Sequence, residues 1–471
     1  MTTREYDLIV IGAGPVGENV ADRAVQGGLT AVIVESELVG GECSYWACMP
    51  SKALLRGGAA LRAARDIAGA REAVTGRLDV AATLQRRDGI THEWSDASQV
   101  EWLETAGIDL VRGHARLSGD REVSVEGADG ATTVLRARHA VAVCTGTDAA
   151  TPDIPGLADA RPWTSREATS VETVPASLAI LGGGIVAVEM ATAFASFGTA
   201  VTVIARSGLL TSLEPFAGEL VGDALRDAGV TIRAGVGTDR VAREGAEVVI
   251  TLSDGSEVRA AEVLAATGRA PRTDDIGLDV VGLAPGSWLD VDDTMRVRGS
   301  DWLYAVGDVN HRALLTHQGK YQARAAGDVI AARAKGDDVQ DAPWGRHVAT
   351  ADRTAVPQVV FTDPEVAAVG HTEASAREAG LDIRVLDYDL SWVAGASTYA
   401  DHYTGRARAI VDLGRGVLVG ATFVGPDIAE LLHSATIAIV GEVPIERLWH
   451  AVPSYPTVSE VWLRWLEELG R

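Results

Sequence analysis

Short apolar runs separated by glycine-rich turns dominate the first part of the chain. Residues 8–11 (Leu-Ile-Val-Ile) are apolar throughout, which predicts a strand buried on both faces. The turn Gly-Ala-Gly-Pro-Val-Gly occupies residues 12–17, and a helical pattern runs from Glu18 to Gln26. A second strand is expected at residues 31–35, where four apolar residues are followed by a glutamate. This order predicts a strand–turn–helix–strand unit of a parallel sheet.

The same pattern returns in the middle of the chain. An apolar run at residues 178–181 leads into Gly-Gly-Gly-Ile-Val-Ala at 182–187, a helix to about Phe197 and a strand at 201–204. Both turns have the spacing G-x-G-x-x-G/A between a strand and a helix, so each offers free N–H groups and a positive helix end to a pyrophosphate. Two such copies predict two dinucleotide sites.

The remaining segments predict a mixed architecture. Residues 60–110 have a largely helical pattern, and several short β-rich runs between 358 and 421 predict antiparallel strands. Residues 428–440 form an apolar helix candidate, residues 461–466 an amphipathic turn, and residues 334–345 a linker before the final domain. We expect an α/β chain with two Rossmann-like dinucleotide-binding domains and an α+β domain at the C-terminus.

The residues that end the second strand of each unit predict different nucleotides. Glu35 ends the first one, where a carboxylate accepts hydrogen bonds from ribose hydroxyls, which suits FAD. In the second unit the strand ends in Ala-Arg-Ser over residues 205–207, and no acid is there to hold a 2′-hydroxyl. Arg206 can pair with a 2′-phosphate instead, which favours NADPH over NADH; the alternative is a solvated surface arginine.

Composition narrows the classes of partner. The chain has 471 residues, 47% of them hydrophobic, and a net charge of −23. Such an acidic surface argues against nucleic acid or an anionic membrane as a partner. No apolar run reaches the roughly 20 residues of a membrane helix, and residues 1–7 lead directly into a strand without room for a signal peptide. We therefore expect a cytoplasmic protein.

Two of the three cysteines carry candidate chemistry. Cys43 and Cys48 lie five positions apart, so a helical turn can bring both sulfurs over one face, close enough to form a disulfide. Placed against a flavin, such a pair stores and releases two electrons. Cys144 is expected to be a small core residue. Lys52 follows the pair in a chain with only two other lysines, Lys320 and Lys335, which suggests a role that arginine cannot fill.

Motifs along nearly the whole chain resemble the pyridine nucleotide–disulfide oxidoreductase family, which includes glutathione reductase, dihydrolipoamide dehydrogenase, mercuric reductase and soluble transhydrogenase. The resemblance rests on the two glycine turns with Glu35 and Glu189, on Cys-Met-Pro-Ser-Lys at 48–52, and on Cys-Thr-Gly-Thr at 144–147. Further matches are Ala-Thr-Gly-Arg-Ala-Pro at 266–271, Tyr-Ala-Val-Gly-Asp at 304–308, Phe-Thr-Asp-Pro-Glu at 361–365 and Pro-Thr-Val-Ser-Glu at 456–460.

The resemblance implies a homodimer whose active site is shared between subunits and which acts on a small molecule. Its domains would be an FAD domain over 1–150, an NAD(P) domain over 151–272, a second FAD or central part over 273–345 and a dimerisation domain over 346–471. The residues expected at FAD are Gly12, Gly14, Pro15, Val16, Gly17, Glu35, Ser36, Gly41, Glu42, Cys43, Lys52, His114, Ala115, Thr145, Gly146, Asp308 and Thr316. Those expected at NADPH are Gly182, Gly184, Ile185, Glu189, Arg206, Gly268 and Arg269.

The resemblance also assigns roles to the catalytic residues. Nicotinamide would stack on one flavin face, with the cysteine pair on the other. Cys48 would lie next to the flavin as the charge-transfer thiolate, and Cys43 would be the interchange thiol that attacks the substrate. Lys52 and Glu189 would form a pair near the flavin N5 that stabilises negative charge on the reduced ring.

Two departures from the family pattern bear on the substrate. Thiol-reducing relatives carry a histidine as acid/base near the C-terminus, and here Tyr455 stands in its place. A phenol with a pKa of about 10 is a poor base at neutral pH but still donates a hydrogen bond. Glu460 has either lost the role of orienting a histidine or binds Tyr455. Tyr45 and Trp46 lie between the cysteines, where they either wall a substrate pocket or point into the core.

The function expected from these residues is transfer of electrons from NADPH through FAD to the disulfide of Cys43 and Cys48, and on to a disulfide or another sulfur electrophile. One alternative is a flavin-only NAD(P)H reductase of the quinone, transhydrogenase or diaphorase type. Another is a mercuric reductase-like enzyme. Mercuric reductase also has a C-terminal cysteine pair that delivers the metal, and no cysteine follows Cys144 in this sequence, so mercuric reduction is the less favoured expectation.

Overall fold

A computed structural model describes residues 2–470 of the protein. Its internal contacts divide the chain into two compact units, each built from three stretches. The first unit takes the residues up to Met49, then Asp88–Asp148 and Arg269–Arg353. The second takes Pro50–Arg87, Ala149–Gly268 and the residues from Thr354 onward.

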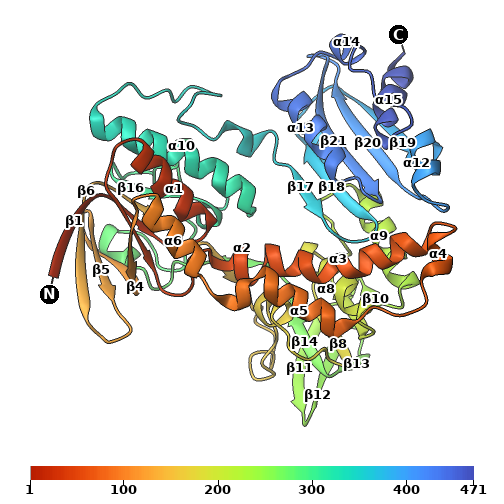
Figure 1. Ribbon diagram of the computed structural model, residues 1–471, viewed down its shortest axis with the longest axis horizontal. Helices are drawn as coiled ribbons and strands as arrows, with labels where there is room; N and C mark the ends of the chain where they lie inside the picture. Colours follow the sequence, from red (N-terminus) through yellow and green to blue (C-terminus); the bar gives the residue numbers. More distant parts are fainter. Residues whose placement is uncertain (1, 471) are drawn as a thin grey trace. The chain divides into compact units, whose positions relative to one another are not determined.

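A mostly parallel sheet forms the centre of the first unit (Figure 1). Its strand order is β3-β2-β1-β6-β5-β4, with β16 paired to β6. The middle strand β1 (Thr2–Ile11) runs parallel to β2 (Ala31–Glu35) and to β6 (Thr132–Val143). Residues 8–11 of β1 are fully or almost fully buried, which confirms the strand predicted from their unbroken apolar run.

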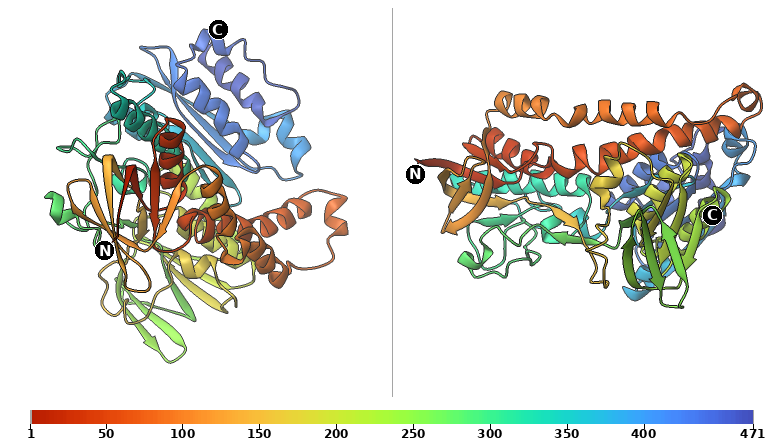
Figure 2. Two further views of the ribbon diagram at one scale, coloured as in Figure 1. Left: turned by 60° about the vertical axis from the view of Figure 1, so that its left-hand side comes forward. Right: turned by 90° about the horizontal axis from the view of Figure 1, so that it is seen from below.

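Two helices of the first unit pack side by side, α1 (Pro15–Gln26) and α10 (Thr316–Lys335) (Figures 1 and 2). Glycines permit the close approach, since a Cβ on Gly319 would lie 2.6 Å from Val16 Cγ2 and one on Gly327 would lie 2.5 Å from Arg23 Cβ. Because α10 continues to Lys335, the linker expected at 334–345 begins two residues later than predicted. The contacts of α10 with the end of α1 reach this far, since a Cβ on Gly28 would lie 3.5 Å from Lys335 Nζ.

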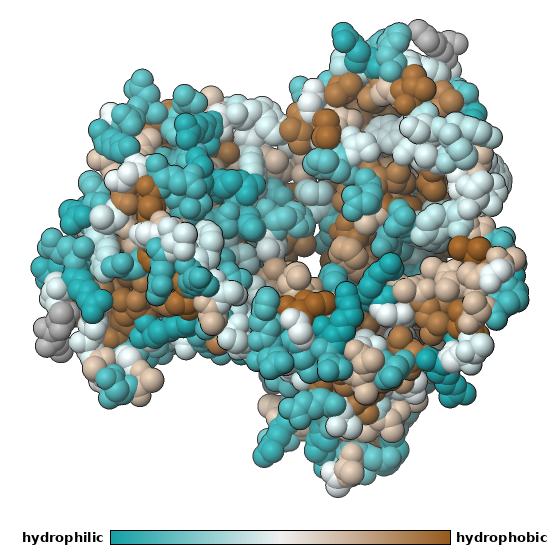
Figure 3. Space-filling model, in the orientation of Figure 1, coloured by the Kyte–Doolittle hydropathy of each residue, from teal (hydrophilic) through white to brown (hydrophobic). Residues whose placement is uncertain are grey.

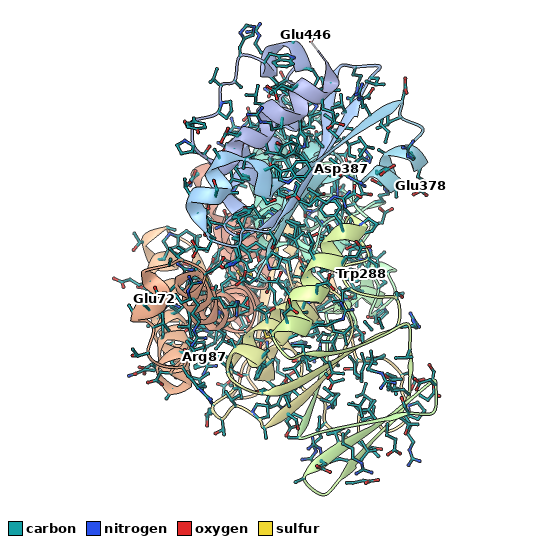
Figure 4. The ribbon with its side chains drawn as sticks, turned by 90° about the vertical axis from the view of Figure 1, so that its right-hand side faces the viewer. Glu72, Arg87, Trp288, Glu378, Asp387 and Glu446 are labelled. Atoms are coloured by element: carbon teal, nitrogen blue, oxygen red, sulfur yellow. The ribbon has the colours of Figure 1, made fainter. Side chains whose placement is uncertain are left out.

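The second unit contains the second dinucleotide-type sheet and a C-terminal sheet. The strand order of the first is β10-β9-β8-β14, all parallel, and β8 (Ser177–Leu181) leads into α8 (Ile185–Ser196), as predicted. The C-terminal sheet has the order β17-β18-β21-β20-β19, all antiparallel, which confirms the expectation for residues 358–421. Figure 4 labels Asp387 on β19 and Glu378 at the end of α11.

The helix expected at 428–440 begins later than predicted. A short 3₁₀ turn, η6 (Ala429–Leu431), precedes the α-helix α13 (Leu432–Val440). The amphipathic C-terminal pattern forms α15 (Val461–Leu469), which buries Val461, Trp465 and Leu466. Apolar side chains are also visible at the surface over α13 (Figure 3), where Ile437 is 56% and Val440 39% exposed.

The other elements complete the two units, and each is given under the unit that holds most of its residues. Helices α3 and α5 and strand β7 cross the division, because residues 48–49 and 88–90 belong to the first unit and residue 149 to the second. In the first unit they are α2 (Gly41–Tyr45), η1 (His92–Trp94), α6 (Ala97–Thr105), β3 (Asp109–Arg112), β4 (His114–Gly119), β5 (Glu122–Glu126), β7 (Thr147–Ala149), β15 (Arg269–Pro271), η2 (Leu278–Val281), β16 (Leu303–Ala305), η3 (Asp308–Asn310) and η4 (Thr350–Arg353). In the second unit they are α3 (Cys48–Arg65), α4 (Ala70–Ala73), α5 (Val80–Ile90), α7 (Ser165–Thr169), β9 (Ala200–Ala205), α9 (Pro215–Asp227), β10 (Thr231–Ala234), β11 (Thr238–Glu244), β12 (Glu247–Leu252), β13 (Glu257–Ala260), β14 (Glu262–Ala265), β17 (Gln358–Val360), β18 (Glu365–Gly370), α11 (Glu373–Glu378), β19 (Ile383–Asp389), η5 (Leu390–Trp392), α12 (Ala394–Tyr399), β20 (Arg406–Asp412), β21 (Val417–Gly425), α14 (Ile445–Leu448) and η7 (Val458–Glu460).

Candidate functional site

A cavity of about 340 Å³ lies in the first unit, at the carboxyl ends of the parallel strands. All the residues expected at FAD except Gly17 and Lys52 line it: Gly12, Gly14, Pro15, Val16, Glu35, Ser36, Gly41, Glu42, Cys43, His114, Ala115, Thr145, Gly146, Asp308 and Thr316. Gly17 lies beneath the turn, where a Cβ would be 1.9 Å from the carbonyl oxygen of Gly12. The turn therefore needs glycine there for packing rather than for ligand contact.

The first glycine turn presents its backbone to this cavity. Gly12 has φ +101°, and a Cβ there would lie 2.5 Å from the carbonyl oxygen of Cys144. A Cβ added to Gly14 would have no other atom within 4 Å, so the backbone is open on that side. Helix α1 begins at Pro15, and its first N–H groups and dipole therefore favour an anion such as a pyrophosphate.

Glu35 is held rigidly at the end of β2. Its Oε2 accepts a hydrogen bond from the Ala13 N–H at 2.7 Å, and its Oε1 accepts one from the Glu37 N–H at 2.8 Å. A carboxylate has further lone pairs, so Glu35 can also accept from a ribose hydroxyl in the cavity. The two backbone bonds fix the direction in which it does so.

A hydrogen-bonded network reaches the cavity from Thr147. Its hydroxyl donates to Asp308 Oδ2 at 2.8 Å and accepts from Arg269 Nε at 2.9 Å. Burial raises the pKa of Asp308. Arg269, which was expected at NADPH, also lines this cavity. Thr145 Oγ1 is buried and has no hydrogen-bond partner within the described chain, so a bound ligand would satisfy it. These donors and acceptors fit FAD.

The two cysteines lie together beside this cavity. Cys43 comes from α2 and lines the cavity, and its side chain is hydrogen-bonded to that of Cys48 at the start of α3. The sulfur of Cys48 lies 3.3 Å from the hydroxyl oxygen of Thr316, the first residue of α10. The hydrogen bond to Cys48, followed by burial, raises the pKa of the Cys43 thiol. The contact between the two side chains allows a disulfide to form with little movement.

The two aromatic residues between the cysteines, Tyr45 and Trp46, were expected either to wall a substrate pocket or to point into the core, and they differ in the structure. Tyr45 is 2% exposed, and its hydroxyl donates to the carbonyl of Val39 at 3.1 Å. Tyr45 therefore points into the core and does not wall a substrate pocket. Trp46 packs edge-on against it, with ring centroids 5.7 Å apart, and stays partly accessible.

Lys52 and Glu189 form an ion pair in the second unit, with 2.8 Å between Nζ and Oε2. Glu189, on α8, is 4% exposed at its side chain and also accepts a hydrogen bond from the Phe361 N–H at 2.9 Å. The Lys52 ammonium lies 4.9 Å from the centre of the Phe361 ring. The structure thus brings together two residues that are far apart in the sequence.

The second glycine turn has the geometry of the first. Gly182 has φ +125°, and a Cβ there would lie 2.2 Å from the carbonyl oxygen of Ala266. Gly184 precedes Ile185, the first residue of α8, and has open space at its Cβ position. Arg206 is exposed just beyond β9, and no carboxylate in residues 2–470 pairs with it. Gly268 has φ +147°, a conformation that favours glycine.

The C-terminal residues expected to be catalytic are not in contact with each other. Tyr455 is 78% exposed, whereas Glu460 is 6% exposed. Glu460 Oε2 is buried without a hydrogen-bond partner in the described chain, and its Oε1 lies 3.7 Å from Arg464. Of the two expectations for Glu460, binding to Tyr455 is the one that this geometry does not show.

Two charged residues on the packed helices α1 and α10 were missed as candidates from the sequence. Glu18 on α1 is 9% exposed, and its Oε1 has no hydrogen-bond partner in the described chain. Lys320 lies on α10, one turn after Thr316. The rarity of lysine in this chain could have marked Lys320 as a candidate. Only the structure shows that its charge acts on Glu18.

The chain is similar to known proteins over most of its length. The model for "pyridine nucleotide-disulphide oxidoreductase" matches residues 6–328, and that for the family's dimerisation domain matches residues 356–465. The chain belongs to the pyridine nucleotide–disulphide oxidoreductase family. It is 35% identical to the mercuric reductase of Shigella flexneri over 96% of this chain and 79% of that protein. It is 32% identical to the dihydrolipoyl dehydrogenase of Haloferax volcanii, covering 96% of this chain and 94% of that one.

Solved structures show the same fold. LpdA from Mycobacterium tuberculosis has a TM-score of 0.83 at 24% identity, with 100% of both chains covered. The HOCl-induced flavoprotein disulfide reductase RclA from Escherichia coli, in a Cu(II) complex, has a TM-score of 0.84 at 23% identity, covering 99% of this chain and 100% of that one.

The family membership confirms the expected class of enzyme. The protein is an NAD(P)H-dependent flavoprotein disulfide oxidoreductase of the mercuric reductase and dihydrolipoyl dehydrogenase type, with FAD and a redox-active disulfide. Its C-terminal dimerisation domain supports a homodimer. Within the described residues, no helix is long and apolar enough to cross a membrane.

Proposed function

We propose that the enzyme passes electrons from NADPH through FAD to the disulfide of Cys43 and Cys48, and on to a disulfide or another sulfur electrophile. The observation that carries this is the contact between the two cysteines beside a cavity whose donors and acceptors fit FAD. FAD supplies the two-electron chemistry when it is bound. The protein binds it through the first glycine turn, Glu35 and Asp308, and holds the sulfurs next to it.

The roles of the two cysteines follow the family. Cys48, whose sulfur contacts Thr316 Oγ1, is the thiolate that interacts with the flavin. Cys43 is the thiol that attacks the acceptor. The N-terminus of α10 lies at this point, and its dipole stabilises a thiolate.

An anaerobic titration tests the redox role of the cysteines. One equivalent of NADPH per flavin should produce a long-wavelength absorption band from a thiolate close to the flavin. Cys48→Ser should lack the band. Cys43→Ser, which keeps the thiolate of Cys48, should show it before reduction and serves as the matched control. A normal quinone-reduction rate in the double variant, with no band in the wild type, would establish the flavin-only alternative instead.

The preference for NADPH rests on Arg206. An exposed guanidinium just beyond β9 is placed to pair with a 2′-phosphate, and the strand carries no acid there for a free 2′-hydroxyl. We expect a higher kcat/KM for NADPH than for NADH, and a ratio reduced about tenfold or more in Arg206→Gln. Arg240→Gln, which changes another exposed arginine of the second unit, should leave the ratio unchanged. A clear preference of the wild type for NADH would refute the assignment.

The homodimer gives the exposed C-terminal segment a function. Tyr455 is 78% exposed in one subunit and stands where relatives carry the histidine that serves the interchange thiol. We infer that it donates a hydrogen bond in the active site of the partner subunit. A screen of low-molecular-weight disulfides with NADPH would identify the acceptor. If the Tyr455→Ala variant turned over every accepted disulfide at the wild-type rate, this role would be excluded.

Reduction of Hg(II) is the second candidate. The identity with the mercuric reductase of Shigella flexneri, together with Tyr455 and the Ala-Arg-Ser segment at 205–207, favours it. The test is NADPH oxidation dependent on Hg(II) in the presence of excess thiol. Turnover that needs both Cys43 and Cys48 would support this candidate, and enzyme inhibition by Hg(II) without turnover would exclude it.

A further inference from the structure

Arg272 joins three segments of the wall of the FAD cavity. It lies just beyond β15, and its backbone N–H donates to the carbonyl of Gly146 at 3.0 Å. Its guanidinium donates from Nε to Asp148 Oδ1 at 2.7 Å and from Nη2 to Glu42 Oε1 at 2.9 Å. Its Nη1 lies 3.8 Å from Glu37 Oε2. All four of these charged residues line the cavity, so one cation meets acids from β7, from α2 and from the segment after β2.

The cavity is acidic for a site that takes an anion. Among residues 2–470, seven acids line it, against the two arginines Arg269 and Arg272. Arg269 is engaged with Thr147, since its Nε donates to the hydroxyl and its Nη2 to the carbonyl of that residue. The pyrophosphate of FAD is a dianion, and like charges repel each other strongly where water screens them little. Arg272 is therefore the cation placed to offset the acids that it meets.

Glu42 is the acid that the fold brings to the pyrophosphate end of the cavity. The residue before it packs on the first glycine turn, because a Cβ on Gly41 would lie 2.9 Å from Gly14 Cα. The Gly40 N–H also donates to the carbonyl of Ala13 in that turn, at 2.7 Å. The turn and the N-terminus of α1 attract an anion to this place, whereas a carboxylate beside it repels the anion.

We propose that Arg272 neutralises this acidic wall, so that the cavity can hold the dianionic pyrophosphate of FAD. Its guanidinium offsets the charges of Glu42 and Asp148, and it also ties together the segments that carry them. Glu42 directly precedes Cys43 on α2, so the same tie reaches the segment that bears the interchange thiol. This role of Arg272 depends on the proposed binding of FAD in this cavity, but on neither the acceptor nor the roles of the two cysteines.

The burial of these groups indicates which acid matters most. The side chain of Glu42 is 19% exposed, that of Arg272 30% and that of Asp148 57%. Water screens the charge of Asp148 more than that of Glu42, so the charge of Glu42 acts more strongly on an anion in the cavity. When Arg272 is changed, we therefore expect the charge of Glu42 to decide how tightly FAD is held.

The test is the rate at which the FAD-loaded enzyme releases FAD after dilution, followed by the fluorescence of the free flavin. Arg272→Met should release FAD about tenfold faster than the wild type, because Glu42 loses a charged hydrogen bond and its carboxylate then repels the pyrophosphate. The double variant Arg272→Met/Glu42→Gln should release FAD more slowly than Arg272→Met, since that carboxylate is gone. Salt at about 1 M, where the screening length is about 3 Å, should slow the release from Arg272→Met for the same reason.

Matched controls are Arg298→Met, which removes an arginine that pairs with Asp290, and Glu101→Gln, which changes an exposed glutamate on α6. Neither residue lines the cavity, so both controls should release FAD at the wild-type rate. The melting temperature reports on folding. Glu42→Gln alone keeps Arg272 and should release FAD more slowly than the wild type, so the role stays testable even if Arg272→Met does not fold.

The outcomes separate neutralisation from a purely structural tie. If Arg272 only held the segments together, both Arg272 variants would release FAD equally fast and salt would not slow the release; that result overturns the proposal. Release from Arg272→Met at the wild-type rate, or faster release from Glu42→Gln than from the wild type, also overturns it. A wild type that binds no FAD would refute the proposed function itself, which is a distinct result.

Discussion

Thr147 links two charged residues of the FAD cavity. Replacing it by valine exchanges a hydroxyl for a methyl group, and we expect this small change to destabilise the protein strongly. Thr147 is 1% exposed. Its hydroxyl donates to Asp308 and accepts from Arg269, at 2.8 and 2.9 Å. Thr147→Val keeps the side-chain volume but removes both hydrogen bonds.

The expected magnitude follows from these two bonds. A hydrogen bond to a charged group contributes about 1.5–3 kcal/mol, so two of them set an upper limit of about 6 kcal/mol. Arg269 keeps a bond to the carbonyl of Thr147 at 2.6 Å. Asp308, whose pKa is already raised by burial, can also take up a proton when it loses its donor. We therefore expect a loss of about 2–4 kcal/mol.

The assay is urea unfolding of the FAD-loaded protein, followed by circular dichroism, together with release of FAD followed by its fluorescence. Thr147→Ser is the control, because it keeps the hydroxyl and loses only a methyl group, at a cost of about 1 kcal/mol. The valine variant should unfold at the lower urea concentration and lose FAD more readily. If it unfolded at the same concentration as the serine variant, or at a higher one, the network would not stabilise the cavity.

Three further predictions concern Lys52, Tyr455 and Glu18. Within residues 2–470, Lys52→Met leaves the buried Glu189 with the Phe361 N–H as its one donor, and because Lys52 is 35% exposed the stability loss should be small, about 1–2 kcal/mol. Stopped-flow reduction of the flavin by NADPH should be slower in this variant, and an unchanged rate would refute a role near the flavin. Tyr455→Phe should lower kcat with a disulfide acceptor by about 100-fold without changing the melting temperature or flavin reduction, and wild-type turnover would exclude the phenol as a hydrogen-bond donor. For Glu18, the pKa in the folded state is raised from 4.5 to about 7, so its stabilising contribution is complete below pH 4.5 and is lost as the pH rises to about 7. The glutamine of the Glu18→Gln variant does not titrate, so the free energy of unfolding of the variant relative to that of the wild type should rise by up to about 3 kcal/mol between pH 5 and pH 8. Urea midpoints that change in parallel for both proteins would contradict this.

The glycine turns show how far local sequence determines this fold. Gly12 and Gly182 have positive φ angles and lie against a neighbouring strand, where a Cβ would collide with backbone atoms. Such positions require glycine, so the spacing of the motif predicts both the turn and the helix N-terminus that follows. The apolar run at 8–11 predicted a central strand for a similar reason, since only a strand buried on both faces has no polar positions.

The limits of the sequence appear where long-range packing sets the outcome. The linker predicted at 334–345 starts later because α10 packs against α1 along its length, and nothing local reveals that contact. Tyr45 was open between a pocket wall and the core, and its bond to the Val39 carbonyl decides for the core. Arg269 was expected at NADPH from the family resemblance; only the structure shows that its guanidinium also donates to Thr147, 122 positions away in the sequence.

The sequence by itself determined the family, the two nucleotide turns, the cysteine pair and the likeness of Lys52 and Glu189 to a charged pair, because each of these depends on residue types at fixed short spacings. The tertiary structure decided which charged groups are buried and which of them act on one another. Glu18 and Lys320 are about 300 residues apart, and the packing of α1 against α10 lets the charge of Lys320 oppose the rise that burial causes in the pKa of Glu18. Burial and distance set the electrostatics of a site, and neither can be read from spacing along the chain.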